Sequence, residues 1–237
     1  MFETITSYPR KLARQYCLTS NTIRYVIEYR CLVNLLSGRE SSFELLLDLG
    51  AGSGEMSARL IDAGFARRAI AVEPFAGNFA KLKQRYSRLK ESQCFNCSLE
   101  TAPIGPGAAD LVICTQVLEH IEDDAAAVAR ISELTKPNGL VLISVPHPPE
   151  IFPNPGHVRP GYTLEALSGL CLQHGLGVLN HDYFFTLPTL RRMVAAEELG
   201  IFGKLLPLGW ADREAKLSTA EKTSLQPYGL ACLFERR

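Results

Sequence analysis

The sequence predicts an α/β fold: a doubly wound, seven-stranded and mostly parallel sheet with helices on both faces. Three observations support this prediction. Short apolar runs of strand length alternate with longer segments of helical periodicity, and a glycine-rich turn follows the first apolar run. The length of 237 residues and the hydrophobic content of 46% suffice for one large domain with a substantial core.

The elements follow from these patterns in chain order. We expect strands near 45–49, 69–72, 93–98, 110–114, 140–145, 176–185 and 228–235, and helices near 8–37, 54–63, 77–90, 122–136 and 164–174. Acidic residues open the helix at 122, as suits the positive end of a helix dipole, and Thr163 is placed to cap the helix at 164. The sequence therefore divides into an N-terminal helical cap over 1–42 and the main domain over 43–237.

Composition limits the classes of function. The 25 basic residues balance the 25 acidic ones, which argues against nucleic acid or an anionic membrane as a partner, because phosphate contacts need a basic excess. The seven cysteines are an odd number scattered among apolar segments, typical of reduced thiols. The first residues do not resemble a signal peptide, and no apolar run approaches membrane-spanning length. We expect a soluble cytoplasmic protein.

The segment from Asp48 to Glu55, which reads Asp-Leu-Gly-Ala-Gly-Ser-Gly-Glu, carries most of the chemical information. A dinucleotide-binding turn needs Gly-x-Gly-x-x-Gly so that a pyrophosphate can meet the helix N-terminus. Counted from Gly50, the sixth position is Glu55, whose carboxylate would repel a pyrophosphate. The sequence therefore disfavours a nicotinamide dinucleotide.

The same segment closely resembles motif I of the class I S-adenosylmethionine-dependent methyltransferases, which have a Rossmann-like sheet. The resemblance implies S-adenosylmethionine as cofactor and the turn residues Asp48, Gly50, Ala51 and Gly52 as part of its site. The chemistry agrees, because this cofactor has no phosphate, its ammonium needs acceptors, and glycines let the backbone approach it closely. Glu73, which follows the second strand and precedes Pro74, suits the two ribose hydroxyls.

The resemblance covers about residues 43–180 and is closest to the small-molecule subgroup that includes ubiquinone-biosynthesis enzymes, the type 11 methyltransferases. Residues 98–103 are similar to the family's loop beside the adenine, which implies contacts from Ser98 and the Leu99 backbone. Ser98 replaces the usual Asp there. The 110–124 segment, with its Leu-Glu-His, is similar to the family's fourth strand, which places Thr115 and Gln116 against the cofactor.

Candidate bases for the acceptor are His120 and His147, which follow the fourth and fifth strands. A structural role competes for each of them. We expect no metal: Cys94 and Cys97 match Cys-x-x-Cys, but residues three apart on a strand face opposite ways and no second pair stands nearby.

The predicted function is methyl transfer from S-adenosylmethionine to a small molecule, with a hydroxyl acceptor favoured by family frequency and by the histidines. Transfer to nitrogen or carbon of a small molecule stays open, and so does a non-catalytic regulatory module that binds the cofactor. A nucleic-acid methyltransferase is disfavoured, because Thr115 to Leu118 lack the Asn/Asp-Pro-Pro-aromatic motif used on exocyclic amines. The segment 186–227 is either a helical flap that completes the core or a lid over an apolar acceptor. The oligomeric state stays open.

Overall fold

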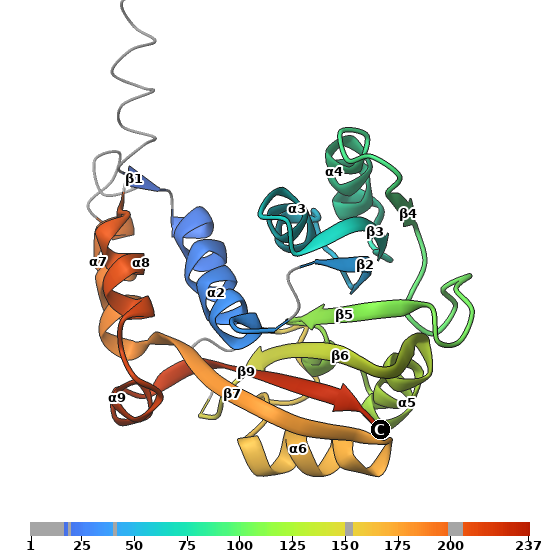
Figure 1. Cartoon of the computed structure of the whole chain (residues 1–237). Coiled ribbons are helices and arrows are strands. Elements are labelled where there is room, and N and C mark those ends of the chain that lie inside the picture. Colours follow the sequence, from blue (N-terminus) through green and yellow to red (C-terminus); the bar gives the residue numbers. More distant parts are fainter. Residues whose placement is uncertain (1–16, 19, 40–41, 150–153, 199–205) are drawn as a thin grey trace, which may run out of the picture. The chain divides into compact units, whose positions relative to one another are not determined.

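The computed structural model describes residues 17–18, 20–39, 42–149, 154–198 and 206–237 (Figure 1). The chain forms two compact units. The larger comprises residues 32–182 and 228–237, and the smaller comprises residues 1–31 and 183–227. In the described part of the chain, none of the helices is long and apolar enough to cross a bilayer.

The larger unit is built on a seven-stranded sheet with the order β4-β3-β2-β5-β6-β9-β7. The neighbours among β2 to β6 run parallel, and β9 pairs antiparallel with β6. This arrangement confirms the mostly parallel, doubly wound sheet predicted from the sequence. The strands are β2 (Phe43–Leu49), β3 (Ala66–Val72), β4 (Gln93–Phe95), β5 (Ala109–Thr115), β6 (Thr135–Pro146), β7 (Leu176–Thr186) and β9 (Pro227–Arg236).

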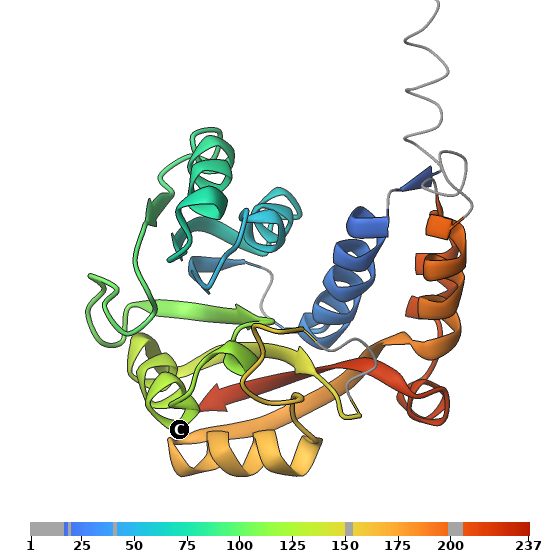
Figure 2. The same cartoon turned by 180° about the vertical axis from the view of Figure 1, so that it is seen from behind.

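Helices cover both faces of this sheet, and the strand order explains which helix covers which face. From β2 the chain winds through β3 to β4, whereas from β5 it winds through β6 the opposite way. Right-handed crossovers in opposite directions place their helices on opposite faces. Accordingly, Figures 1 and 2 show α3 and α4 on the side of the sheet away from α6. The helices are α3 (Glu55–Asp62), α4 (Ala76–Tyr86), α5 (Asp124–Leu134) and α6 (Leu164–Gln173).

The central strands are buried on both faces, as their unbroken apolar runs predict. The side chains of Leu46, Leu47, Leu111 and Ile113 are fully buried. Two helix starts also match the sequence: the Thr163 side chain accepts the N–H of Ala166, and the Asp123 side chain accepts that of Ala126. Because β2, β3, β5 and β6 are parallel, their carboxyl ends meet at one edge of the sheet, where we look for the site.

Two expectations about the elements are wrong. The helix expected over 8–37 is observed as α2 (Ser20–Leu36), and Cys17–Leu18 forms a short strand, β1. Residues 8–16 lie outside the described residues. The helix expected to reach 136 ends at Leu134, because Thr135 already pairs with Ala109 and starts β6.

The smaller unit holds most of α2 together with α7 (Leu187–Glu198), α8 (Gly209–Ala215) and α9 (Thr219–Ser224). In this unit β1 pairs antiparallel with β8 (Leu206–Pro207). A buried carboxylate of this unit, Glu214, accepts the backbone N–H of Thr186 at 2.8 Å and the Thr189 hydroxyl at 2.6 Å. The described parts of the segment 186–227 are thus mainly helical, as expected. Its role as a lid and the domain boundary at residue 42 stay predictions.

Candidate functional site

The glycine turn joins the ends of β2 and β3. The backbone N–H groups of Gly50 and Ala51 both donate to the carbonyl oxygen of Val72, at 3.0 and 2.9 Å. Gly50 has φ +76°, and a Cβ there would lie 2.4 Å from a methyl group of Val117, after β5. A left-handed conformation and this close approach together require glycine. The turn therefore brings the ends of β2, β3 and β5 together.

Glu73 lies directly beside this turn. One carboxylate oxygen, Oε2, accepts the N–H of Gly52 at 2.7 Å, and Oε1 accepts the N–H of Phe75 at 2.9 Å. Glu73 is only 3% exposed, whereas the neighbouring Phe75 ring is 71% exposed. Each carboxylate oxygen has a second lone pair, so Glu73 can still accept hydrogen bonds from a diol. The exposed Pro74 continues the chain into α4.

The structure adds Asn96, which the sequence analysis missed. Its side-chain amide donates to the carbonyl oxygens of Glu73 and Pro74, at 2.8 and 3.0 Å, and so ties the end of β4 to the end of β3. In the sequence, Asn96 stands only as a residue between two cysteines, and no motif there indicates this contact. Ser98, two residues further, shares a hydrogen bond of 3.2 Å with the Thr101 hydroxyl, and Leu99 is buried.

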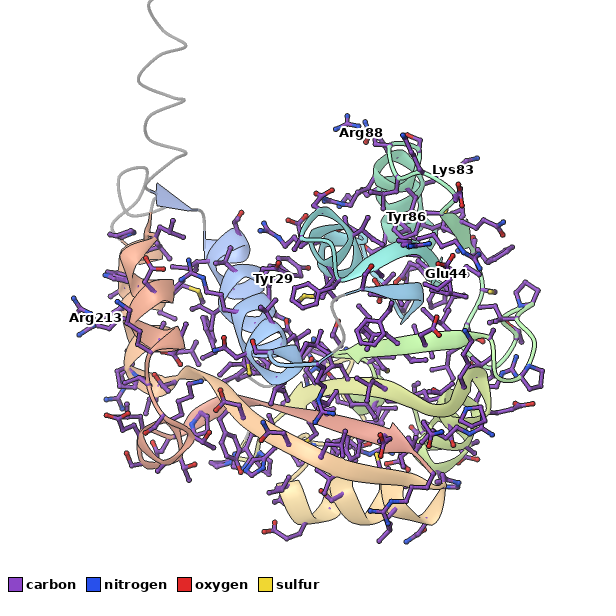
Figure 3. The ribbon with its side chains drawn as sticks, viewed as in Figure 1. Tyr29, Glu44, Lys83, Tyr86, Arg88 and Arg213 are labelled. Atoms are coloured by element: carbon purple, nitrogen blue, oxygen red, sulfur yellow. The ribbon has the colours of Figure 1, made fainter. Side chains whose placement is uncertain are left out.

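Asp48 is the most perturbed acid of the site. It is 1% exposed, and within the described chain neither carboxylate oxygen has a hydrogen-bond partner of acceptable geometry. Burial raises the pKa of Asp48 to about 7. The polar groups of nearby Ser57 oppose this rise, and the negative charge of Glu73 adds to it. Tyr86, on the face of α4 toward the sheet, donates its hydroxyl to Ser57 at 2.8 Å (Figure 3).

Thr115 ends β5, and Gln116 follows in a left-handed conformation with φ +56°. The backbone N–H of Gln116 donates to the carbonyl oxygen of Ser144 on β6, at 2.8 Å. Its side-chain nitrogen Nε2 is buried and has no acceptor among the described residues. A buried donor without a partner is costly, so this amide is suited to a ligand that brings an acceptor.

The structure corrects the sequence argument about Glu55. Its carboxylate forms ion pairs with Arg59 at 2.7 Å and with Arg85 at 2.6 Å. The Arg85 side chain also donates to the carbonyl oxygen of Ser53. Because two guanidinium groups compensate this charge, repulsion by Glu55 is not what disfavours a dinucleotide. The buried carboxylate of Asp48 carries that argument instead, because an acid in the place of Glu73 also suits the ribose of a dinucleotide.

His120 belongs to a short 3-10 helix, Leu118–His120, that follows β5. Its Nδ1 is 2.8 Å from the carbonyl oxygen of Gly156, and its ring meets that of His157 edge-on with 4.7 Å between the ring centroids. The neighbouring Glu119 is 1% exposed. The sequence analysis missed this pairing of Glu119 and His157 with His120, because it depends on how the chain after β6 folds back.

Arg159 holds that returning segment in place. Its guanidinium donates to the carbonyl oxygens of Leu118 and Ile121, at 2.7 and 2.6 Å, which caps the 3-10 helix. Tyr162, also in the returning segment, donates its hydroxyl to Asp124 at 2.7 Å. No periodicity or motif in the sequence indicates this role of Arg159.

His147, the other candidate base, follows β6. Its backbone N–H donates to the carbonyl oxygen of Tyr228 on β9, at 2.7 Å. Burial lowers the pKa of its side chain, and the negative charge of Glu165 partly opposes that shift. The imidazole is therefore neutral at pH 7 and able to accept a proton.

Comparisons with known proteins agree with this geometry. Residues 47–143 match the family model described as a methyltransferase domain. A probable S-adenosylmethionine-dependent methyltransferase of Mycolicibacterium smegmatis is 30% identical over 142 residues, which cover 57% of this chain and 51% of the relative. A ubiquinone biosynthesis O-methyltransferase of Colwellia psychrerythraea is 31% identical over 99 residues, 42% of this chain and 40% of the relative.

Among solved structures, the N-methyltransferase NodS of Bradyrhizobium japonicum, in complex with S-adenosylhomocysteine, has the same fold. Its TM-score is 0.59 at 14% identity, and the match covers 88% of this chain and 85% of that one. Residues 47–143 carry a methyltransferase domain whose relatives are of the S-adenosylmethionine-dependent type, and the sheet has the class I fold. The family and the fold predicted from the sequence are thereby confirmed. The chain spans only about half the length of the Mycolicibacterium relative.

The methyltransferase site offers the groups that this family's cofactor needs. S-adenosylmethionine carries an ammonium, a carboxylate, a ribose diol and an adenine. The buried carboxylate of Asp48 suits the ammonium, and the amide of Gln116, whose Nε2 has no acceptor among the described residues, suits an acceptor on the ligand. Apart from its chain neighbours, no atom of the described residues lies within 4 Å of the Cβ position of Gly52, so the backbone there is open to close approach. The residues present therefore fit the cofactor.

Proposed function

We propose that this methyltransferase domain transfers a methyl group from S-adenosylmethionine to a hydroxyl group of a small molecule. The observation that carries the proposal is the pair of buried carboxylates, Asp48 and Glu73, beside the glycine turn. The pair favours a cofactor with an ammonium and a diol, and Asp48 disfavours a pyrophosphate beside the turn.

In this proposal each strand end contributes one part of the cofactor site. Asp48 with the turn residues Gly50, Ala51 and Gly52 holds the amino-acid part, and Glu73 with Pro74 holds the ribose. Further along the edge, the adenine lies against Ser98 and Leu99, and Thr115 and Gln116 close the site. Glu73 already accepts two backbone N–H groups, so its carboxylate is oriented before the ribose arrives.

When bound, S-adenosylmethionine supplies a methyl group on a sulfonium, which an acceptor oxygen takes by in-line displacement with release of S-adenosylhomocysteine and a proton. The protein's part is to align the acceptor and to remove that proton. His147 is suited to accept it, because burial keeps the imidazole neutral at pH 7. His120 is the second candidate: its Nδ1–H donates to Gly156, which leaves Nε2 with its lone pair.

Two facts support a small hydroxyl acceptor. The chain's formal net charge is +0, which offers no general attraction for polyanions. One relative methylates oxygen in ubiquinone biosynthesis, by its name. Transfer to nitrogen or carbon is the alternative, as in the N-methyltransferase NodS, which shares the fold. A regulatory module that only binds the cofactor is the remaining alternative, and product formation separates it from an enzyme.

The first test is calorimetric titration of the full chain with S-adenosylmethionine and, separately, with NAD⁺. We expect binding of the former only. Glu73→Gln should weaken that binding at least about tenfold, because a charge-assisted hydrogen bond is worth ~1.5–3 kcal/mol. Glu44→Gln is the matched control, since Glu44 lies at the other end of β2 and pairs with Arg67 on the surface (Figure 3).

The second test incubates the chain with methyl-labelled S-adenosylmethionine and a panel of phenols, alcohols and amines. Label in a methyl ether supports the proposed acceptor, and label in an amine replaces it by the alternative. If NAD⁺ binds and S-adenosylmethionine does not, the proposed cofactor is wrong. If the cofactor binds and neither this panel nor a metabolite extract is methylated, the regulatory module is the better explanation.

A further inference from the structure

Three side chains with metal-ligating atoms gather beyond the end of β5. Glu119, His120 and His157 each place one such atom within 4.8 Å of the other two. Glu119 is buried, His157 is half-buried and His120 is exposed, so the cluster reaches from the interior to the surface. Two imidazoles and one carboxylate make a common ligand set for zinc and other divalent transition metals.

The backbone holds the two parts of this cluster together. The N–H of Val158, next to His157, donates to the carbonyl oxygen of Glu119 at 2.9 Å. On the other side, Arg159 binds the carbonyl oxygens that flank Glu119 and His120. The approach of His157 to the 3-10 helix is thus fixed by main-chain hydrogen bonds and does not depend on the flexible side chains alone.

The orientation of His120 also suits a ligand. Because a carbonyl oxygen can only accept, the 2.8 Å contact with Gly156 places the proton on Nδ1. Neutral His120 therefore has its lone pair on Nε2. Metal-binding histidines usually donate their other N–H to a carbonyl or carboxylate in this manner, which fixes the ring and its tautomer.

We propose that Glu119, His120 and His157 bind one divalent transition metal ion, of which Zn²⁺ is the reference, and that its open coordination position takes the acceptor hydroxyl. The second part rests on the proposed function and deepens it: His120 then acts as a metal ligand and not as a base, which leaves His147 as the candidate base. A metal ion lowers the pKa of a coordinated hydroxyl and so eases its deprotonation. The proposal replaces the sequence expectation of no metal, which considered only the two cysteines.

The geometry sets a condition on this proposal. In a four-coordinate site with metal–ligand bonds of about 2.1 Å, the ligand atoms lie about 3.4 Å from one another. The ligand atoms of the three side chains lie up to 4.8 Å apart, so they must approach one another by up to ~1.4 Å. The exposed His120 ring has room for such a movement at the surface. Three protein ligands leave a fourth position for water or substrate.

The test uses the full chain, freed of metal by a chelator, and measures binding of Zn²⁺ by competition with a chromogenic chelator. We expect one ion per chain, with binding at least tenfold weaker in Glu119→Gln and in His157→Gln. His181→Gln, on β7 outside the cluster, should bind like the wild type. Substitution with Co²⁺ adds a spectroscopic signature, because its visible bands report nitrogen and oxygen ligands as opposed to thiolates.

A Cys94→Ser/Cys97→Ser double variant checks for binding by these half-buried thiols. The metal proposal is overturned if that variant loses the ion, if the His181 control loses it equally, or if the folded wild type binds none. Circular dichroism confirms that each variant is folded. Methyl transfer without metal binding would leave the proposed function intact. Metal binding without methyl transfer would overturn the function and the acceptor's place on the metal, while the metal site itself would stand.

Discussion

Replacing Asp48 by Asn tests what the buried carboxylate costs the cofactor-free protein. An unfolded Asp has a pKa of 3.8, and burial raises that of folded Asp48 to about 7. At about 1.4 kcal/mol per pKa unit, this difference amounts to ~4 kcal/mol. Because the folded pKa is the higher one, the stabilising effect of the bound proton is complete below pH 3.8 and is lost as the pH rises through 7.

Asp48→Asn has no such proton to lose. We therefore expect the free energy of unfolding of Asp48→Asn to rise relative to that of the wild type as the pH rises. Between pH 5 and pH 8 this relative change should amount to about 2.5 kcal/mol of the ~4 kcal/mol. Urea unfolding of both proteins at several pH values measures this change. Asp62→Asn, at the exposed end of α3, is the control and should show a flat difference. A flat difference for Asp48→Asn as well would refute the reasoning.

The same variant should bind S-adenosylmethionine less well although it is more stable at pH 8. In the wild type, the ligand's ammonium favours the ionised form of Asp48, so binding near pH 6 should release a proton. Titrations in buffers of different ionisation enthalpy detect that proton, and Asp48→Asn should not release it. Unchanged affinity in the variant would contradict the role proposed for Asp48.

Four further substitutions test the architecture of the site. Gly50→Ala should destabilise the protein by at least about 2 kcal/mol, because the backbone is left-handed there and the new Cβ would meet Val117. Gly52→Ala has only the backbone strain, so chemical unfolding of both variants separates the two effects. Arg159→Ala should release the segment that follows β6 and lower kcat/KM at least tenfold with a smaller loss of cofactor affinity, and equal losses would contradict its positioning role. Thr163→Ala should cost about 1 kcal/mol in thermal or urea unfolding through loss of the helix cap, and no change would contradict the capping role.

The sequence predicts those parts of the site that depend on local pattern. A buried strand, a glycine turn and an acid after the next strand fix where Asp48, Gly50 and Glu73 lie, because adjacent parallel strands end at the same edge. The Thr163 cap is local as well. Strand β6 was placed correctly at its apolar core, but its first residues were missed, because Thr135 enters the strand through pairing with Ala109.

The parts that the sequence could not predict depend on contacts distant in the chain. Asn96 matters because its amide reaches back 23 residues to the carbonyl oxygen of Glu73. Similarly, His157 reaches His120 because Val158 N–H binds the carbonyl oxygen of Glu119 and the Arg159 side chain binds carbonyls 38 and 41 residues away. No periodicity or spacing encodes such pairings. The role of Glu55 was misjudged for the same reason, since its partner Arg85 comes from the next helix.

The buried acids explain why this edge of the sheet favours positively charged ligands. Asp48, Glu73 and Glu119 are 1%, 3% and 1% exposed, and they follow or end β2, β3 and β5, which are neighbours in the sheet. The charges of these acids also act on a neighbouring thiol. Burial raises the pKa of Cys114 well above its ordinary value, and the negative charges of Glu119 and Asp48 raise it further. Without a ligand, this edge reduces its negative charge by keeping a proton on Asp48 up to about pH 7. A ligand that brings an ammonium or a metal ion replaces that proton, whereas a pyrophosphate would add to the repulsion. The stability lost by burying these acids is thus the source of the selectivity we propose for the cofactor and for the metal ion.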